Sequence, residues 1–86
     1  MKVLIPTQLH SYTSGASQVM AQGRLLSEVL DSLDGQFPGI RFRVVDEQDR
    51  IREHIRIFVG GSLMKGINVP VAEHQEVQIV GALSGG

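Results

Sequence analysis

The sequence predicts an α+β roll, in which one main amphipathic helix covers one face of a mixed β-sheet of four to five strands. Three observations predict this fold. Residues 26–37 carry a single apolar stripe of helical period, short runs with strand patterning lie on both sides of it, and a two-glycine turn separates two extended segments. With 86 residues, the chain 1–86 is expected to be a single domain.

Two strands are expected before the helix. Residues 2–8 alternate so that Val3 and Ile5 share one face of a first strand. The polar segment 10–17 is expected to form a loop, and residues 18–21 are expected to form a short second strand. A strand, a glycine-containing loop and another strand in this order predict a β-hairpin.

The helix is predicted by apolar residues spaced i, i+3, i+4, i+7 and i+11, namely Leu26, Val29, Leu30, Leu33 and Phe37. Its start is poorly capped, because Leu25 stands where a serine or threonine usually accepts hydrogen bonds from the first amides. Gly35 and then Pro38-Gly39 mark its end. A helix of about 11 residues is not stable alone, so we expect it to lie on the sheet.

The segment after the helix is charged and mixed. Residues 40–45 alternate apolar and basic side chains, without a clear assignment to helix or strand. Residues 46–53 form a charged run, which predicts a solvated connector. Residues 54–59 alternate clearly, which predicts a strand with Ile55, Ile57 and Val59 inward and His54, Arg56 and Phe58 outward.

The last third of the chain is expected to return to the centre of the sheet. Gly60-Gly61 suits the positive φ angles of a tight hairpin turn. Residues 62–72 are expected to be irregular, and residues 76–82 are expected to form the final strand. The first and last strands are expected to lie side by side in parallel, since the helix supplies the crossover that such pairing needs.

Composition excludes several functional classes. The formal net charge is −1, from eight basic and nine acidic residues, so we expect neither nucleic acid nor an acidic membrane as partner. The chain has no cysteine, and its three histidines (His10, His54 and His74) are far apart, so we expect no metal site. No signal peptide or membrane span is recognisable, which predicts a cytoplasmic protein.

Catalytic motifs are also missing. The sequence contains no phosphate-binding glycine motif and no serine elbow, and its carboxylates lie mostly in surface runs. We therefore expect no catalytic residue and no bound cofactor. The sequence indicates a protein on which enzymes act, rather than an enzyme.

The closing residues Leu83, Ser84, Gly85 and Gly86 are expected to be a flexible tail, 83–86, after the final strand. Gly85 and Gly86 have no Cβ, so this end fits a channel too narrow for other residue pairs. Four extended residues reach about 14 Å, far enough to place a free α-carboxylate of Gly86 inside another protein. The alternative is a frayed terminus of small residues without a function.

Six segments in order resemble the ubiquitin-like sulfur-carrier family, namely KVLIPT (2–7), EVLDSL (28–33), FPG (37–39), IFVGG (57–61), EVQIV (76–80) and SGG (84–86). This family includes the small subunit of molybdopterin synthase, the thiamine-pathway carrier and the carrier of a cysteine-synthesis pathway. The opening segment and the long stretch 37–56 look most like the molybdopterin-synthase and cysteine branches. The similarity covers nearly the whole chain.

The resemblance implies a β-grasp fold and a function for the tail. In this family an ATP-dependent adenylating enzyme activates the carboxylate at the position of Gly86, and a thiocarboxylate forms there that donates sulfur to a biosynthetic enzyme. Pro6, Leu63 and Val80 match hydrophobic contact positions of the molybdopterin-synthase small subunit. With the outward Phe58, they are the predicted docking patch, although another part of the chain could instead cover Phe58.

Three alternatives stay open. The chain could be a stable subunit of molybdopterin synthase, with its tail held in a larger catalytic partner. It could be a ubiquitin-like interaction module whose Gly-Gly end is incidental. It could also be conjugated to a lysine through Gly86. The sequence does not name the pathway that receives the sulfur.

Overall fold

The computed structural model describes residues 1–81, so the predicted tail (Leu83, Ser84, Gly85 and Gly86) lies outside the described residues. Along this part of the chain the elements are β1 (Lys2–Leu4), the 3-10 helix η1 (Thr7–Leu9), β2 (Gln18–Met20), α1 (Leu26–Gln36), α2 (Ile40–Val44), β3 (Ile55–Val59), β4 (Ser62–Leu63) and β5 (Val77–Gly81). Within these residues no helix has the length and apolar character needed to cross a membrane.

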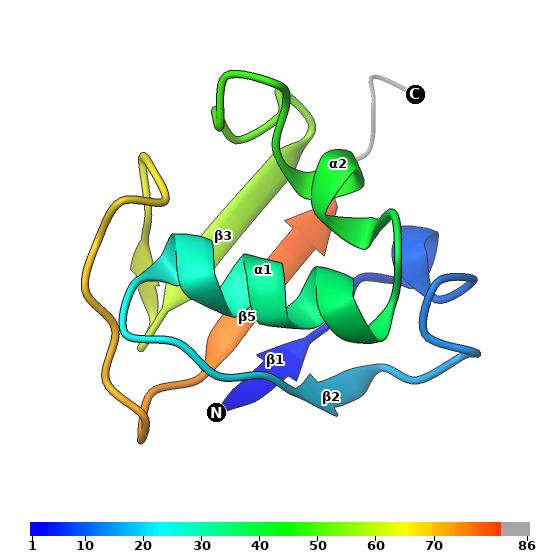
Figure 1. Ribbon diagram of the computed structural model, residues 1–86, viewed down its shortest axis with the longest axis horizontal. Coiled ribbons are helices and arrows are strands. Elements are labelled where there is room, and N and C mark those ends of the chain that lie inside the picture. The colour runs from blue at the N-terminus through cyan, green and yellow to red at the C-terminus, as the bar shows by residue number, and fades with distance from the viewer. Residues whose placement is uncertain (82–86) are drawn as a thin grey trace.

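The strands form one sheet in the order β2-β1-β5-β3-β4 (Figure 1). Strands β1 and β5 run parallel at its centre, with Val3 opposite Val77, and the other neighbours are antiparallel. The predicted central pairing of the first and last strands is therefore confirmed. The predicted hairpins are also present: β1 pairs with β2, and Gly60 and Gly61 turn the chain between β3 and β4 with φ angles of 57° and 86°.

Helix α1 lies across one face of this sheet, as Figure 1 shows. Its stripe is fully buried at Leu26, Val29, Leu30 and Leu33. The stripe belongs to a single core with the inward side chains of the sheet, including Val3, Ile57, Val77 and Ile79. The predicted helix is confirmed, with Phe37 as its half-buried C-terminal cap residue.

The start of α1 uses the Glu28 side chain in place of a cap from Leu25. The Glu28 carboxylate accepts hydrogen bonds from the backbone N–H groups of Arg24 (2.8 Å) and Leu25 (3.3 Å). Leu25 itself provides no side-chain hydrogen bond, as its chemistry dictates. A carboxylate at the N-terminal turn also interacts favourably with the helix dipole.

Three segments differ from the sequence expectation. The first strand ends at Leu4 rather than residue 8, and the 3-10 helix η1 follows the proline at position 6, which has no amide hydrogen for a sheet ladder. Residues 40–44 form the short helix α2. Ser62–Leu63, expected to be irregular, forms the two-residue strand β4 as the second arm of the glycine hairpin.

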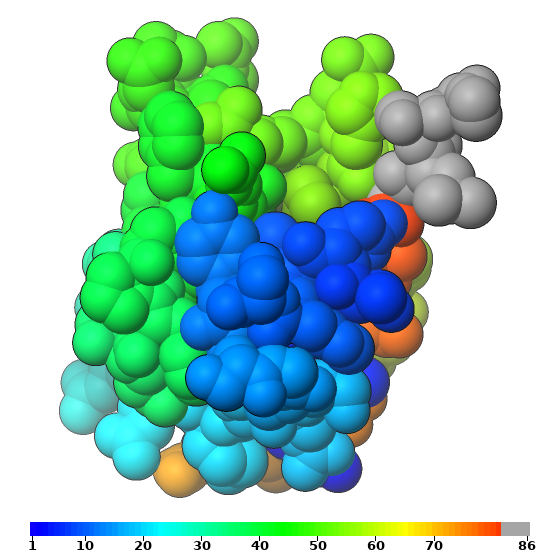
Figure 2. Space-filling model, turned by 90° about the vertical axis from the view of Figure 1, so that its right-hand side faces the viewer, coloured from blue at the N-terminus to red at the C-terminus, as the bar shows by residue number. Residues whose placement is uncertain are grey.

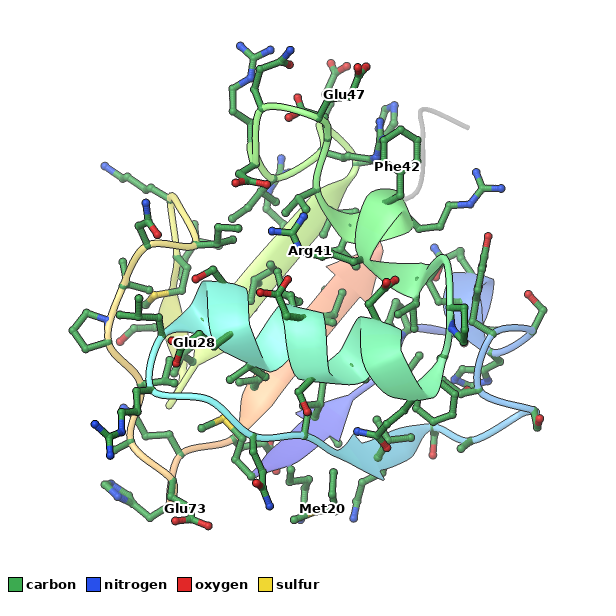
Figure 3. All side chains as sticks on the ribbon, viewed as in Figure 1. Met20, Glu28, Arg41, Phe42, Glu47 and Glu73 are labelled. Atoms are coloured by element: carbon green, nitrogen blue, oxygen red, sulfur yellow. The ribbon has the colours of Figure 1, made fainter. Side chains whose placement is uncertain are left out.

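Helix α2 explains why alternation was ambiguous there. Ile40 and Val44 are buried, while Phe42 is 55 % exposed and projects outward from the helix (Figure 3). A spacing of four residues satisfies both an alternating pattern and one turn of a helix. The exposure of Phe42 and the burial of Val45 next to Val44 both depart from strand alternation, and only the second leaves a trace in the sequence, as one extra apolar residue.

Candidate functional site

The attachment point of the tail is the carboxyl end of the central strand β5. Gly81, its last residue, pairs with Ile55 of β3, and its carbonyl accepts a hydrogen bond from the Gln8 side-chain amide (3.3 Å). Strands β1 and β3 hold β5 on both sides. The sequence 82–86 therefore continues from the central strand of the sheet, at an end that pairs with β3.

The four residues of the predicted docking patch lie on the sheet face opposite α1. Phe58 stands opposite Leu63, and Arg56 stands opposite Val80, which places these side chains on one face. Pro6 and Val80 line the same shallow groove. Leu63 is 51 % exposed, and the other three residues are half-buried. The structure thus brings the four residues to one surface, and their role in docking stays a prediction.

Two further residues complete this face between the predicted ones. Leu4 and Gln78 are neighbours across the parallel pair β1–β5, and both line the groove with Pro6 and Val80. The sequence contained a signal for Leu4, because the alternation that turns Val3 inward places its neighbour Leu4 on the outer face.

A second pocket, of about 440 Å³, opens beside Gly81 and was not predicted. It is formed by the segment around η1, by α2 and by the residues that precede β3. Figure 2 shows this side of the molecule, where the η1 segment (blue) meets the α2 segment (green). Its lining comprises Gln8, Leu9, Ser11, Tyr12, Arg43, Arg52, His54, Ile55 and Gly81. Among residues 1–81, no aspartate or glutamate lines this pocket.

The two arginines of this pocket are fixed through their Nε atoms. Arg43 Nε donates to the Tyr12 hydroxyl (2.6 Å), and its guanidinium carbon lies 5.9 Å from the Tyr12 ring centroid. Arg52 Nε donates to the Phe42 carbonyl oxygen (2.6 Å), and its guanidinium carbon lies 4.5 Å from the Phe42 ring centroid. Among residues 1–81 neither arginine forms an ion pair. Both guanidinium groups are therefore positioned while their charge is uncompensated.

The three histidines occupy separate environments. His10 Nε2 lies 3.0 Å from the Ile5 carbonyl oxygen, His54 lines the pocket beside Gly81, and His74 is exposed in the turn before β5. In the described part of the chain no group of three histidine, aspartate or glutamate side chains is arranged to hold a metal ion.

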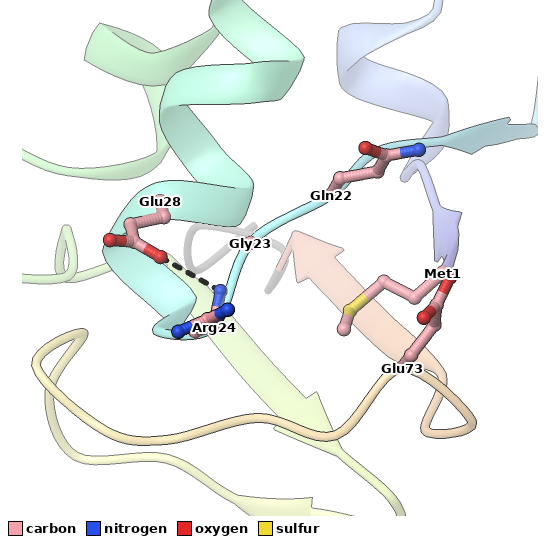
Figure 4. Close-up of a pocket in the computed structure, with 6 residues that line it drawn as sticks. All are labelled: Met1, Gln22, Gly23, Arg24, Glu28 and Glu73. Carbon is pink, nitrogen blue, oxygen red and sulfur yellow. Dashed lines mark hydrogen bonds between the residues drawn. The ribbon is translucent and has the colours of Figure 1, made fainter.

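Another groove lies at the other end of β5, beside the turn that precedes this strand (Figure 4). Met1, Gln22, Gly23, Arg24, Glu28 and Glu73 line it, and it encloses about 700 Å³. The Glu28 carboxylate there is already an acceptor for the backbone at the start of α1. The lining residues include no serine, threonine, cysteine or lysine that could act as a nucleophile.

Known sulfur carrier proteins are similar to this chain over nearly its full length. The sulfur carrier protein CysO of Mycobacterium tuberculosis and that of Mycobacterium bovis are each 29 % identical to this chain over 89 residues, which cover 98 % of this chain and 96 % of the relative. A crystal structure of the Amycolatopsis orientalis BexX/CysO complex contains a chain that matches with a TM-score of 0.90 and 28 % identity, covering 99 % of this chain and 98 % of that chain. The predicted resemblance to the ubiquitin-like sulfur-carrier family is therefore confirmed.

The β-grasp fold implied by the sequence is confirmed by the same matches. The small archaeal modifier protein 1 of Methanosarcina acetivorans also matches, with a TM-score of 0.79 at 21 % identity, and that likeness shows the fold alone. No protein-family model matches the chain. The likeness to sulfur carriers therefore rests on the CysO relatives, which the chain matches over nearly its full length.

Proposed function

We propose that this chain is a sulfur carrier in cysteine biosynthesis, loaded with sulfur at the α-carboxylate of Gly86. Its similarity to CysO over almost the whole of both chains carries this proposal. The closing Ser84-Gly85-Gly86 and the position of β5 at the centre of the sheet support it. The chain would act as a protein co-substrate in the cytoplasm, with the reaction chemistry supplied by its partner enzymes.

The chemistry begins with activation, because an ionised α-carboxylate with a pKa near 3.5 is a poor electrophile at neutral pH. A carboxylate oxygen of Gly86 attacks the α-phosphorus of ATP on the adenylating enzyme, and pyrophosphate leaves. Hydrosulfide or an equivalent sulfur donor then attacks the acyl carbon, and AMP leaves with the oxygen that joined it to the acyl group. The product is a thiocarboxylate, which differs from the starting carboxylate by one sulfur in place of one oxygen.

The fold would serve this chemistry by delivery. Residues 82–86, if extended, reach roughly 17 Å beyond Gly81 at about 3.4 Å per residue. The rigid sheet fixes the starting point of this reach, and the Gly85-Gly86 pair lets it enter a narrow tunnel. Docking of the surface formed by Pro6, Phe58, Leu63 and Val80 would set the direction. Holding a reactant in place in this way replaces a bimolecular encounter.

Intact-mass spectrometry tests the proposal. The purified chain, incubated with an ATP-dependent adenylating enzyme of the sulfur-carrier type, ATP and sulfide, should gain about 16 Da, the mass difference between sulfur and oxygen. A variant with one alanine appended after Gly86, and a reaction without ATP, are the controls and should gain nothing. Absence of the gain with several such enzymes would overturn the proposal.

The acceptor decides between the branches of the family. Transfer of sulfur to an enzyme of cysteine synthesis is the outcome we expect from the similarity to CysO. Co-purification as a stable complex with a large molybdopterin-synthase subunit would instead support the molybdopterin branch. Because the match to the archaeal modifier protein shows the fold alone, conjugation to lysine has no separate support.

A further inference from the structure

We propose that the pocket beside Gly81, with Arg43, Arg52 and His54 in its wall, is a docking site for an acidic segment at the tunnel mouth of the adenylating enzyme. The inference rests on the proposed function, because it concerns the enzyme that receives the tail. It adds a charged contact to the apolar patch predicted on the sheet face.

The position of the pocket places it within reach of that enzyme. Gly81 ends β5 and also lines the pocket. The thiocarboxylate site is only five residues further along the sequence. An enzyme that encloses these residues up to the sheet would bring its surface close to Gly81 and to the pocket that Gly81 lines.

Covering the pocket would remove water from charged groups that have no internal partner. The ion pairs formed within residues 1–81 involve Lys2, Arg41 and Arg50, and neither Arg43 nor Arg52 takes part in one. The Nη nitrogens of Arg43 and Arg52 also have no hydrogen-bond acceptor among the described residues. Burying an uncompensated charge is strongly unfavourable, so a surface that fits here must supply carboxylates.

The geometry also suits carboxylates in particular. Tyr12 and Phe42 hold the two guanidinium groups through Nε, which leaves both outer nitrogens of each group free. This free edge matches the two oxygens of a carboxylate, and a guanidinium that is already positioned loses less conformational freedom on binding. The remaining wall is largely apolar, with Leu9 and Ile55 beside Tyr12. The structure therefore favours an acidic segment with an apolar side chain next to its carboxylates.

The test compares two arginine variants in the adenylation reaction. Arg43→Gln/Arg52→Gln should raise the KM for the carrier roughly 10- to 100-fold, as expected when a desolvated charge pair is lost, with kcat little changed. Arg24→Gln is the matched control, since Arg24 is exposed, forms no ion pair within residues 1–81 and lies at the opposite end of β5. Its KM should equal that of the wild-type chain.

Salt dependence gives a second readout that a folding defect does not move. The KM of the wild-type carrier should rise with NaCl between 50 and 300 mM (about these limits), and the double variant should show a weaker rise. Arg43→Lys/Arg52→Lys, which keeps the charge but not the planar donors, should restore the salt dependence and only part of the affinity. Thermal melts of all variants confirm that they are folded.

Two results would overturn the inference. One is an unchanged KM in the double glutamine variant, while the wild-type chain gains sulfur normally. The other is a lower KM, which would show that the arginines bind the chain's own terminal carboxylate and compete with the enzyme. Failure of the proposed function is distinct from both, because the wild-type chain itself would then gain no mass.

Discussion

The two ends of strand β5 differ in how their charged groups are satisfied. At its start, the Glu28 carboxylate accepts hydrogen bonds from two backbone amides, and the Lys2 Nζ atom lies 3.7 Å from the Glu76 Oε2 atom. At its end, Arg43 and Arg52 are positioned by aromatic residues and have no carboxylate partner in the described part of the chain. The start is built for the stability of the fold, whereas the end keeps charge available next to the point where the tail begins.

The difference extends to backbone packing. A Cβ added at Gly23, near the start of β5, would lie 2.6 Å from the Val29 amide nitrogen and 2.7 Å from the Glu28 Cβ. The three atoms nearest to a Cβ added at Gly81, at the end of β5, all belong to the terminal amide of the Gln8 side chain, which is exposed and can move. Tight packing is therefore concentrated away from the proposed functional end.

Deletion of Gly86 is expected to have the largest effect on function. The change shortens the tail by about 3.4 Å, and a misplacement of about 1 Å can already cost roughly 100-fold in rate. We expect sulfur transfer to fall at least about 100-fold in a single-turnover assay. The core of the described residues is built from positions between Met1 and Ile79, so the melting temperature should stay unchanged. A large loss of stability would show that the tail supports the fold instead.

Gly23→Ala and Gly81→Ala form a matched pair for the packing contrast. Overpacking against backbone atoms costs about 1–3 kcal/mol, so Gly23→Ala should lower the melting temperature by at least about 5 °C. Gly81→Ala should change it by less than about 2 °C, because only the Gln8 side chain must move. Thermal denaturation monitored by circular dichroism measures both values. Equal losses in the two variants would remove the contrast between the two ends.

Glu28→Ala tests how much the hydrogen bonds of the Glu28 carboxylate, near the start of β5, contribute to the free energy of unfolding. The Arg24 and Leu25 amides lose their acceptor, and the loss of a helix cap costs about 1 kcal/mol. Glu28→Gln retains an oxygen acceptor and should lose less. Urea denaturation gives the free energies of unfolding, and the KM for adenylation should be unchanged in both variants. If the KM rose in either of them, this end of the molecule would also belong to the docking surface.

The smallest expected effect concerns the pKa of Asp46, a carboxylate near α2 that has hydrogen-bond partners. Backbone hydrogen bonds from the amides of Arg50 (3.0 Å) and Gln48 (2.9 Å), with the nearby Arg50 charge, hold the pKa of Asp46 below its ordinary value of 3.8. Its contribution to stability is therefore present above about pH 4 and is lost as the pH falls through the lowered pKa of the folded state. NMR titration of the carboxyl carbon should give a midpoint below 3.8. A midpoint at or above 3.8 would contradict these contacts.

Local patterns were sufficient to predict most of the fold. The stripe from Leu26 to Leu33 predicted α1, and the alternation ending at Val59 with two glycines predicted β3 and its hairpin. Helix α2 could not be assigned, because Ile40 and Val44 suit both a strand face and a helix turn. The 46–53 run was expected to be a solvated connector, yet Arg52 at its end is half-buried over the Phe42 ring.

The candidate site was predicted only where it depends on one strand at a time. Alternation placed Phe58 on the outer face, whereas Pro6, Leu63 and Val80 came from the family resemblance, and the structure sets all four in one surface. The arginine pocket combines residues from four separate segments, and no periodicity links Tyr12 to Arg43 or Arg52. Such a cluster exists only once tertiary packing has brought the segments together. The function of Gly86 stays a prediction from the sequence and the family.

Fragmentation of the loaded chain by tandem mass spectrometry tests the central claim most directly, because it locates the incorporated sulfur. After incubation with the adenylating enzyme, ATP and sulfide, we expect the gain of about 16 Da only in the C-terminal fragments that contain Gly86. A gain located on any other residue, or a fully unmodified Gly86 in a reaction that consumes ATP, would contradict it.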